Sequence, residues 1–287
     1  MSKFILLLIA LLLCCCPVFA QQNRKPHKKG EAPSAQKTLP SDNLIVNGTL
    51  EKGKGREPHG WAGIDGLTAI WDSTDGNPGR CLLFDTSVQQ QDKKTWRTDE
   101  SAYKGPSKGS QYKTVGAHEG VWAYALPIDL TPEDSYFVIE CDVMAPVKSA
   151  ELFYPMVLIR GFNLVTEEMA GKDSSWFHTY HKDGPAYSEM FGPDRLYRPS
   201  KAGDYLMVYR HTLACRISVA NKWEHFAMGF KLPAKDMARF RPQRLLIKPY
   251  AYWPLGKYRF DNIILRRSTK EEMNEINKRR KSIKEFQ

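Results

Sequence analysis

The sequence lacks the motifs that identify the commonest enzyme classes. It also has no long apolar run other than the one within its first twenty residues. Beyond residue 20, no stretch approaches the roughly 20 consecutive apolar residues that a membrane-spanning helix needs. It contains no Gly-x-Ser-x-Gly elbow, no His-Glu-x-x-His motif and no glycine-rich phosphate loop. No pair of acids is marked out for glycoside hydrolysis. The motifs therefore give no direct indication of hydrolase, zinc-peptidase or nucleotide-binding chemistry.

Cysteine is scarce after the first twenty residues, where only Cys81, Cys141 and Cys215 occur. Three cysteines allow at most one internal disulfide. All three lie in apolar, strand-like runs, so they are either buried as small hydrophobes or partly used in one bridge. No Cys-x-x-Cys or Cys/His spacing suits zinc.

Residues 1–20 have the pattern of a secretory signal peptide cleaved after Ala20. Lys3 precedes an apolar run over 4–16, and Val18-Phe-Ala20 comes before a polar stretch. A lipoprotein signal is the alternative, but Leu13, which precedes the first cysteine, is not a small residue. We therefore expect a secreted, periplasmic or cell-surface protein.

The net charge of +10 belongs to the two ends of the chain. Residues 21–40 carry five basic and one acidic residue, and 266–287 carry eight basic and four acidic ones. The body between them is nearly neutral, and no nucleic-acid motif accompanies the basic tails. We expect no nucleic-acid partner, although the tails could contact an anionic polymer.

Pattern and composition divide the chain into four parts. After the signal, residues 21–41 have no hydrophobic periodicity and are predicted to be a disordered basic linker. Residues 42–267 contain short apolar runs separated by turn residues, which predicts one all-β, antiparallel sandwich or barrel. Residues 268–287 begin with a capping box and predict a short amphipathic helix, docked on the sandwich or free for a partner or membrane. The strands are expected near 43–47, 67–71, 80–85, 120–128, 135–146, 150–162, 205–218, 223–232, 243–250 and 257–266.

Alternation fixes the faces of the clearest predicted strand, 135–143. Tyr136 and Glu140 fall on one face, whereas Phe137, Ile139 and Cys141 fall on the other, which is the predicted core face. Two polar, aromatic-containing stretches, 86–119 and 163–204, do not fit a strand. Loops of such length in a compact domain are usually functional or disordered.

Two distant segments resemble the ends of a known fold. One is Asn43-Leu-Ile-Val-Asn-Gly-Thr-Leu-Glu51 followed by Gly60-Trp61, and the other is Lys257-Tyr-Arg-Phe-Asp-Asn-Ile-Ile-Leu265. They resemble the first and last strands of galactose-binding-like jelly-roll carbohydrate-binding modules of the family 4/9/22 type. The resemblance implies a jelly-roll β-sandwich that binds a polysaccharide or glycan without catalysis. It also implies that the two ends of the chain lie side by side.

A structural calcium site is expected where these ends meet, because Ca²⁺ favours six to eight hard oxygen ligands. The candidate ligands are Glu51 and Asp261, with Thr49 and Asp75 less securely placed. In the alternative interpretation, Glu51 caps a turn and Asp261 accepts backbone hydrogen bonds.

Sugar binding would need flat aromatic faces with polar groups beside them. For any one tryptophan, packing in the core is the competing role, and Trp61 and Trp223 fit that role better. The candidate ligand-binding residues are Trp71, Trp96, Trp122, Tyr124, Trp176, Tyr180, Trp253, Arg97 and Arg195.

Two other functional classes stay open. A polysaccharide lyase could use His178, Tyr180 and Arg160 as base and charge-neutralising groups, and jelly rolls also host glycoside hydrolases. An envelope structural or adhesion protein would use the sandwich and its basic tails to contact other polymers. The polar, turn-rich surroundings of Trp96 and Trp176 favour glycan binding.

Overall fold

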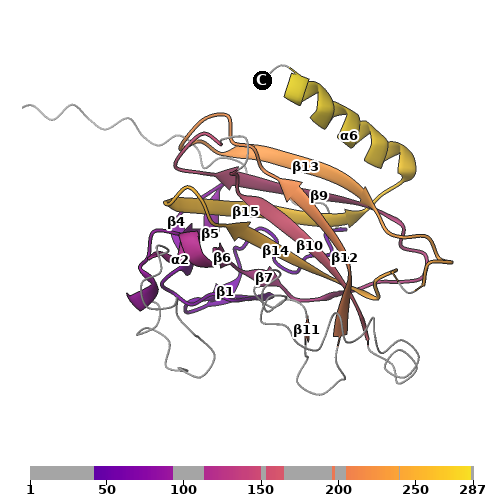
Figure 1. Cartoon of the computed structure of the whole chain (residues 1–287), viewed down its shortest axis with the longest axis horizontal. Helices are drawn as coiled ribbons and strands as arrows, with labels where there is room; N and C mark the ends of the chain where they lie inside the picture. Colours follow the sequence, from indigo (N-terminus) through magenta and orange to yellow (C-terminus); the bar gives the residue numbers. More distant parts are fainter. Residues whose placement is uncertain are drawn as a thin grey trace, which may run out of the picture. The chain divides into compact units, whose positions relative to one another are not determined.

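The structure is a computed structural model that describes residues 42–92, 113–149, 153–164, 196–197, 205–238 and 240–285. Two antiparallel sheets dominate it (Figure 1). The first has five strands in the order β13-β9-β15-β5-β4. The second has the order β11-β12-β10-β14-β6, and β8 also pairs with β14. This arrangement is the all-β, antiparallel jelly-roll sandwich that the sequence predicts.

The bounds of the elements follow the apolar runs closely. The five-stranded sheet consists of β4 (Ala69–Gly76), β5 (Gly79–Asp85), β9 (Tyr136–Met144), β13 (Glu224–Lys231) and β15 (Lys257–Arg267). The six-stranded sheet consists of β6 (Val121–Trp122), β8 (Ile128–Asp129), β10 (Met156–Leu164), β11 (Leu196–Tyr197), β12 (Tyr205–Ala214) and β14 (Arg244–Ala251). The remaining elements are β1 (Gly53–Lys54), β2 (Glu57–Pro58), β3 (Trp61–Ala62), β7 (Tyr124–Ala125), α2 (Val115–His118) and α6 (Lys270–Glu285).

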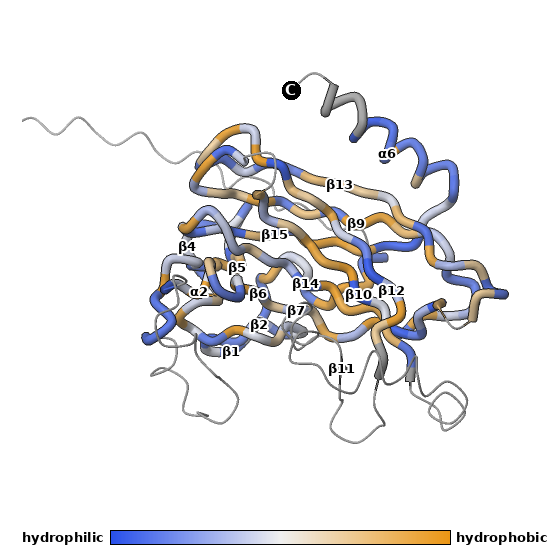
Figure 2. Tube along the Cα trace, in the orientation of Figure 1, coloured by the Kyte–Doolittle hydropathy of each residue, from blue (hydrophilic) through white to orange (hydrophobic). Residues whose placement is uncertain are grey.

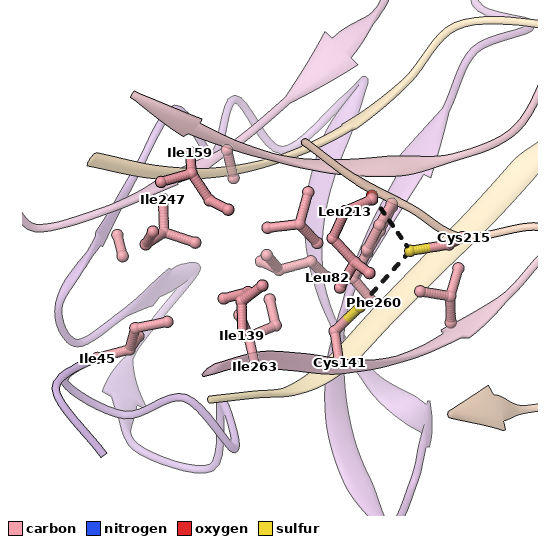
Figure 3. Packing of buried hydrophobic residues seen from close by; sticks show 14 of the residues in the cluster. Ile45, Leu82, Ile139, Cys141, Ile159, Leu213, Cys215, Ile247, Phe260 and Ile263 are labelled. Atoms are coloured by element: carbon pink, nitrogen blue, oxygen red, sulfur yellow. Dashed lines mark hydrogen bonds between the residues drawn. The ribbon is translucent and has the colours of Figure 1, made fainter. Parts of the chain in front are cut away.

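The hydrophobic core lies between the two sheets. Ile139, Leu82 and Phe260 from the five-stranded sheet pack in one cluster with Ile159 and Ile247 from the six-stranded sheet, and all five are at most 3% exposed (Figure 3). The predicted core face of β9 is confirmed, since Phe137, Ile139 and Cys141 are fully buried. Burial of so many apolar side chains is the main stabilising contribution to this sandwich.

The opening segment is not a strand, so the prediction for 43–47 is wrong. The Asn43 side chain bonds to backbone N–H groups that would otherwise be free to pair with another strand. Its Oδ1 accepts from the N–H groups of Ile45 and Leu265, at 3.0 and 2.9 Å. The backbone N–H of Leu44 also donates to the Leu265 carbonyl at 2.7 Å. A turn therefore replaces the strand, yet the segment still lies beside β15, as the resemblance implies.

The predicted strand 120–128 is divided into β6, β7 and β8. These short strands change partners along the chain, because β6 and β8 pair with β14 whereas β7 pairs with β3. Pro127, which has no N–H to donate, stands between β7 and β8.

The C-terminal helix α6 is docked on the edge strand β13. The Asn277 side chain accepts from the Gly229 N–H and donates to the Gly229 carbonyl, both at 3.0 Å. It thereby satisfies backbone groups that an edge strand leaves unpaired. Gly229 permits the approach, since a Cβ there would lie 2.4 Å from Met273 Cγ. Figure 2 shows that α6 is largely hydrophilic, so specific polar contacts contribute to its docking.

The three cysteines are free thiols, and all are buried. Cys141 on β9 and Cys215 after β12 come from different sheets, and their Sγ atoms lie 3.7 Å apart. Burial raises the pKa of the Cys141 thiol, with the Cys215 hydrogen bond adding to the effect. Of the two alternatives, the structure shows the cysteines as small hydrophobic residues of the core.

Candidate functional site

A row of aromatic side chains occupies the outer face of the six-stranded sheet. The rings of Trp122 and Tyr250 are near-parallel, with centroids 6.4 Å apart, and Tyr250 stacks on Tyr252 at 5.7 Å. Phe153 meets the edge of Tyr252 at 5.9 Å. All four side chains are half-buried. This aromatic row, Trp122–Tyr250–Tyr252–Phe153, is the candidate site.

Strand alternation explains why these rings point away from the core. In the sequence Val121-Trp-Ala-Tyr-Ala125, Val121, Ala123 and Ala125 are buried in the core, which leaves Trp122 and Tyr124 facing outwards. Tyr250 lies opposite Trp122 in the β14–β6 register, so both project from the same face. The row is therefore built by the register between β6 and β14.

The Tyr250 ring is fixed in place by its surroundings. Its hydroxyl donates to the Glu119 carbonyl at 3.1 Å. Gly120, at φ +79°, lies directly against the ring, and a Cβ there would come within 2.5 Å of it. A glycine tolerates both this backbone conformation and the close contact. Tyr250 is thus held in one orientation before any ligand arrives.

Polar and apolar groups lie next to the row on the same face. The Lys248 ammonium sits 4.1 Å from the Trp122 ring centroid, and Lys248 is 4% exposed. Tyr124 packs on the buried pair Phe162 and Leu246. The face thus combines aromatic rings with a cation–π contact that supports the Trp122 ring.

The structure brings three of the residues singled out from the sequence onto this face. Trp122 and Tyr124 belong to it, and Arg160 lies opposite Leu246 in the β10–β14 register. The Arg160 guanidinium donates to the carbonyls of Ile159 and His211, each at 3.3 Å. A lyase role for Arg160 finds no further support in these contacts.

Sequence reasoning missed Tyr250, Tyr252 and Lys248. The strand over 243–250 was predicted, and a signal was present in it, because residues 246, 248, 250 and 252 alternate onto one face. What the pattern alone did not supply was the register that places Tyr250 opposite Trp122.

Other predicted residues lie elsewhere. Trp71 is 9% exposed, its indole N–H donates to the Leu50 carbonyl at 2.7 Å, and the Arg80 guanidinium covers its ring. It is a packing residue and presents no open face to a sugar. Trp61 is buried in the core, in agreement with its expected role, and Trp253 is 40% exposed. The other predicted residues fall outside the described residues: Trp96, Arg97, Trp176, His178, Tyr180 and Arg195.

Glu51 and Asp261 both accept backbone hydrogen bonds at the β4–β5 hairpin. Glu51 Oε1 accepts from the Arg80 N–H at 2.8 Å, and Asp261 Oδ2 accepts from the Asn77 N–H at 2.6 Å. Burial raises the pKa of Asp261 to about 7, although two backbone hydrogen bonds oppose the shift, and the charges of Asp142 and Glu51 add to it. The accumulated negative charge is what a cation would relieve.

The remaining predicted calcium ligands are placed less favourably. The Asp75 carboxylate accepts from the Arg259 guanidinium at 2.6 Å. Within the described part of the chain, no three His, Cys, Asp or Glu side chains gather as a metal-binding group. Glu51 and Asp261 therefore fit a cation only if backbone oxygens of the adjoining turns complete the ligand set.

Comparisons with known proteins identify no family. No protein-family model matches the chain, and no curated protein does so either. A search of solved structures finds the enzymatically active domain of bacteriophage CBA120 tailspike protein 4, at 11% identity and a TM-score of 0.39, covering 79% of this chain and 21% of that one. The chain thus spans about a fifth of the tailspike chain.

Two other similar structures are shorter proteins. A family 16 carbohydrate-binding module is 13% identical, with a TM-score of 0.37, over 78% of this chain and 99% of that one. The CBM22-1 xylan-binding domain of Paenibacillus barcinonensis Xyn10C is 11% identical, with a TM-score of 0.36, over 79% and 94%. At these scores the function has to be argued from the site itself.

Proposed function

We propose that this protein binds a polysaccharide or glycan, without catalysis, on the aromatic row of the six-stranded sheet. The observation that carries the proposal is the stacked series Trp122–Tyr250–Tyr252, which is half-buried on the outer face of a sheet. The C–H face of a pyranose ring packs on such flat apolar surfaces, as aromatic faces generally favour.

Preorganisation supports this assignment. Because Tyr250 is held by Glu119 and Gly120, ordering its ring on binding would cost little conformational entropy. Arg160, on the same face, is a cationic hydrogen-bond donor from which sugar hydroxyls could accept, whereas the buried Lys248 ammonium supports the Trp122 ring. The face thus has the rings for stacking and the polar groups for orientation.

Binding to a polysaccharide panel tests the proposal. We expect Trp122→Ala and Tyr250→Ala each to weaken binding by at least about tenfold, since central aromatic anchors commonly contribute most of the binding energy. Tyr136→Ala is the matched control, because it removes a half-buried ring from the outer side of β9 in the other sheet. Unchanged affinity in both test variants, with their folds intact, would refute the proposal.

We also propose that Glu51 and Asp261 hold a structural calcium ion, with oxygens near Thr49 and around Asp75 as further ligands. The raised pKa of Asp261, beside Glu51 and Asp142, supports a site for positive charge. The test compares the melting temperature with excess calcium and with a chelator, for the wild type and for Glu51→Gln. A melting temperature that does not depend on calcium would remove this part of the proposal.

Export is proposed on the N-terminal sequence alone. A mature chain that begins at Gln21 in the extracellular or periplasmic fraction would agree with cleavage after Ala20. Among the described residues, no helix is both long and apolar enough to cross a membrane. N-terminal sequencing or intact mass spectrometry of the exported protein decides this point.

A further inference from the structure

A cleft of about 720 Å³ lies between helix α6 and the edge of the five-stranded sheet. Its floor includes Glu140 and His225, and its helix side includes Glu272 and Arg280. It also reaches Ala214, the last residue of β12 in the other sheet, and Arg216, which follows that strand. The cleft therefore joins the docked helix to the end of the six-stranded sheet that carries the aromatic row.

The acidic groups that line this cleft are already engaged. Arg266 Nη2 lies 3.4 Å from Glu140 and 2.7 Å from Glu272. Glu275 pairs with Arg279 at 3.2 Å. Glu224 accepts the backbone N–H groups of Ser218 and Val219, each at 2.8 Å. None of these carboxylates neutralises the arginines at the far end.

Arg216 and Arg280 have no carboxylate partner in the part of the chain that the structure describes. The Arg216 guanidinium stands 5.0 Å from the Tyr154 ring centroid, and Arg280 donates only to the Ala214 carbonyl, at 3.4 Å. Burial lowers the pKa of Arg280, Cys215 opposes the shift, and the positive charge of Arg216 lowers the pKa further. Two like charges held together without a counter-charge favour an anion between them.

This cationic end is continuous with the aromatic row. Met156 lies opposite Tyr250 on one side and Ala214 on the other. Two positions beyond these residues, just past the ends of the three strands, are Tyr154, Tyr252 and Arg216. Phe153, whose ring contacts Tyr252, directly precedes Tyr154 in the chain, and the Arg216 guanidinium lies over the Tyr154 ring. The aromatic row thus leads from Trp122 through Tyr250, Tyr252 and Phe153 to Tyr154 and Arg216, and Arg280 lines the same cleft as Arg216.

We infer that Arg216 and Arg280 form the anion-binding end of the ligand site, and that the ligand is an acidic glycan whose carboxylate or sulfate group they hold. The inference rests on the proposed function, because it extends the same aromatic row. Arginine suits this role, since its planar fork of N–H donors matches the oxygens of a carboxylate or sulfate.

Calorimetry with matched oligosaccharides tests the inference. The three probes are an oligogalacturonate, its fully methyl-esterified form, and a sulfated oligogalactan, which separate carboxylate, neutral and sulfate recognition. We expect the wild type to bind an acidic probe roughly tenfold more tightly than the ester, as charge-assisted hydrogen bonds predict. Arg216→Gln and Arg280→Gln should lower that affinity to the level of the ester.

Two further variants serve as controls. Lys278→Gln removes the same charge from an exposed position of α6 that does not line the cleft, and it should leave the affinity unchanged. Arg280→Lys keeps the charge but loses the fork, and it should retain part of the preference for acidic probes. Melting temperatures of all variants show that each one is folded.

The outcomes separate this inference from the proposed function. Equal affinity for the ester and the acidic probes, with no effect of the arginine variants, would overturn the inference, and a loss of binding in Tyr250→Ala would still support the aromatic row. Arginine-dependent binding that ignores Tyr250→Ala would support the anion site and refute the aromatic row. Binding of none of the three probes would overturn the inference of an acidic glycan.

Discussion

The outer faces of the two sheets differ in what covers them. On the five-stranded sheet, Glu140, His225 and Arg266 are linked in ion pairs next to helix α6, and Asn277 clasps the edge of β13. On the six-stranded sheet, half-buried rings stack along one line, with Lys248 over Trp122. The chain thus places its own polar helix on one face and aromatic rings on the other.

This difference indicates which face is used for recognition. A sheet face whose charged groups are already paired gains little from a further ligand, because new contacts would have to replace existing ones. Half-buried aromatic rings on a sheet face gain contact area when a flat apolar surface packs on them. The comparison therefore assigns stability to the paired charges beside α6, and ligand binding to the aromatic row and the two arginines at its end.

Inserting a larger side chain between α6 and β13 should have the largest effect on stability. In Gly229→Val the new side chain would overlap Met273, whose Cγ and carbonyl oxygen lie 2.4 and 2.8 Å from the Cβ position. We expect a loss of about 1–3 kcal/mol in the free energy of unfolding, as overpacking typically costs. Affinity for the neutral methyl-esterified probe should stay the same, because the aromatic row is on the other sheet.

Urea denaturation measures the free energy of unfolding of Gly229→Val, and calorimetry measures its glycan affinity. Gly229→Ala with Met273→Ala is the matched relief variant, and it should recover part of the stability. A Gly229→Val protein as stable as the wild type would show that α6 does not need this close approach.

Removing the Asn277 clasp should have a smaller effect. Asn277→Ala takes away two hydrogen bonds to Gly229 and leaves an edge N–H and carbonyl without these partners. We expect a loss of about 1–2 kcal/mol in unfolding free energy, the usual contribution of two modest hydrogen bonds. Asn277→Asp keeps the oxygen that accepts from the Gly229 N–H but loses the amide that donates to the Gly229 carbonyl. Its stability should therefore fall between those of the wild type and Asn277→Ala. Equal stability of all three proteins would contradict the clasp.

The smallest expected effect concerns pH. A hydrogen bond with His225 holds the pKa of Glu140 below its usual value, although burial opposes this, and Arg266 contributes in the same direction. Because the folded-state pKa is lowered, this stabilisation is complete above the unfolded pKa and is lost as the pH falls through the folded one. His225 and Arg266 face Glu140 directly, and Asp142 lies behind His225.

Comparing the wild type with Glu140→Gln checks this expectation. At pH 7 the variant should unfold at a lower urea concentration than the wild type. The difference between their urea midpoints should narrow as the pH is lowered below about 4, where the Glu140 carboxylate is protonated. Glycan affinity should be equal in the two proteins at pH 7. A difference in urea midpoint that does not change with pH would show that the ionised Glu140 carboxylate does not stabilise the outer face of the five-stranded sheet.

Periodicity alone predicted much of the fold. Alternation placed Phe137, Ile139 and Cys141 in the core, and the helical spacing after Ser268 located α6. The same reasoning was wrong for 43–47, because the Asn43 side chain bonds to the backbone and a turn replaces the expected ladder. Local hydrogen bonding of this kind competes with strand formation and leaves no mark on hydrophobic periodicity.

The candidate site was only half predictable. Trp122 and Tyr124 were named as aromatic platforms for a sugar, but the same criterion also selected Trp71, which is buried under Arg80. The partners Tyr250 and Tyr252 depend on the pairing of β14 with β6, strands about 120 residues apart in the chain. Register between distant strands is a tertiary property, so single-chain patterns cannot supply it.

The most direct test of the aromatic row follows the indole N–H signals of the seven tryptophans by NMR during titration with a bound glycan. The Trp122 signal should shift as the ligand saturates. The indoles of Trp61 and Trp71, which donate to the Asn47 and Leu50 carbonyls inside the protein, should stay in place. A glycan that saturates the protein and leaves the Trp122 signal unmoved would contradict the account.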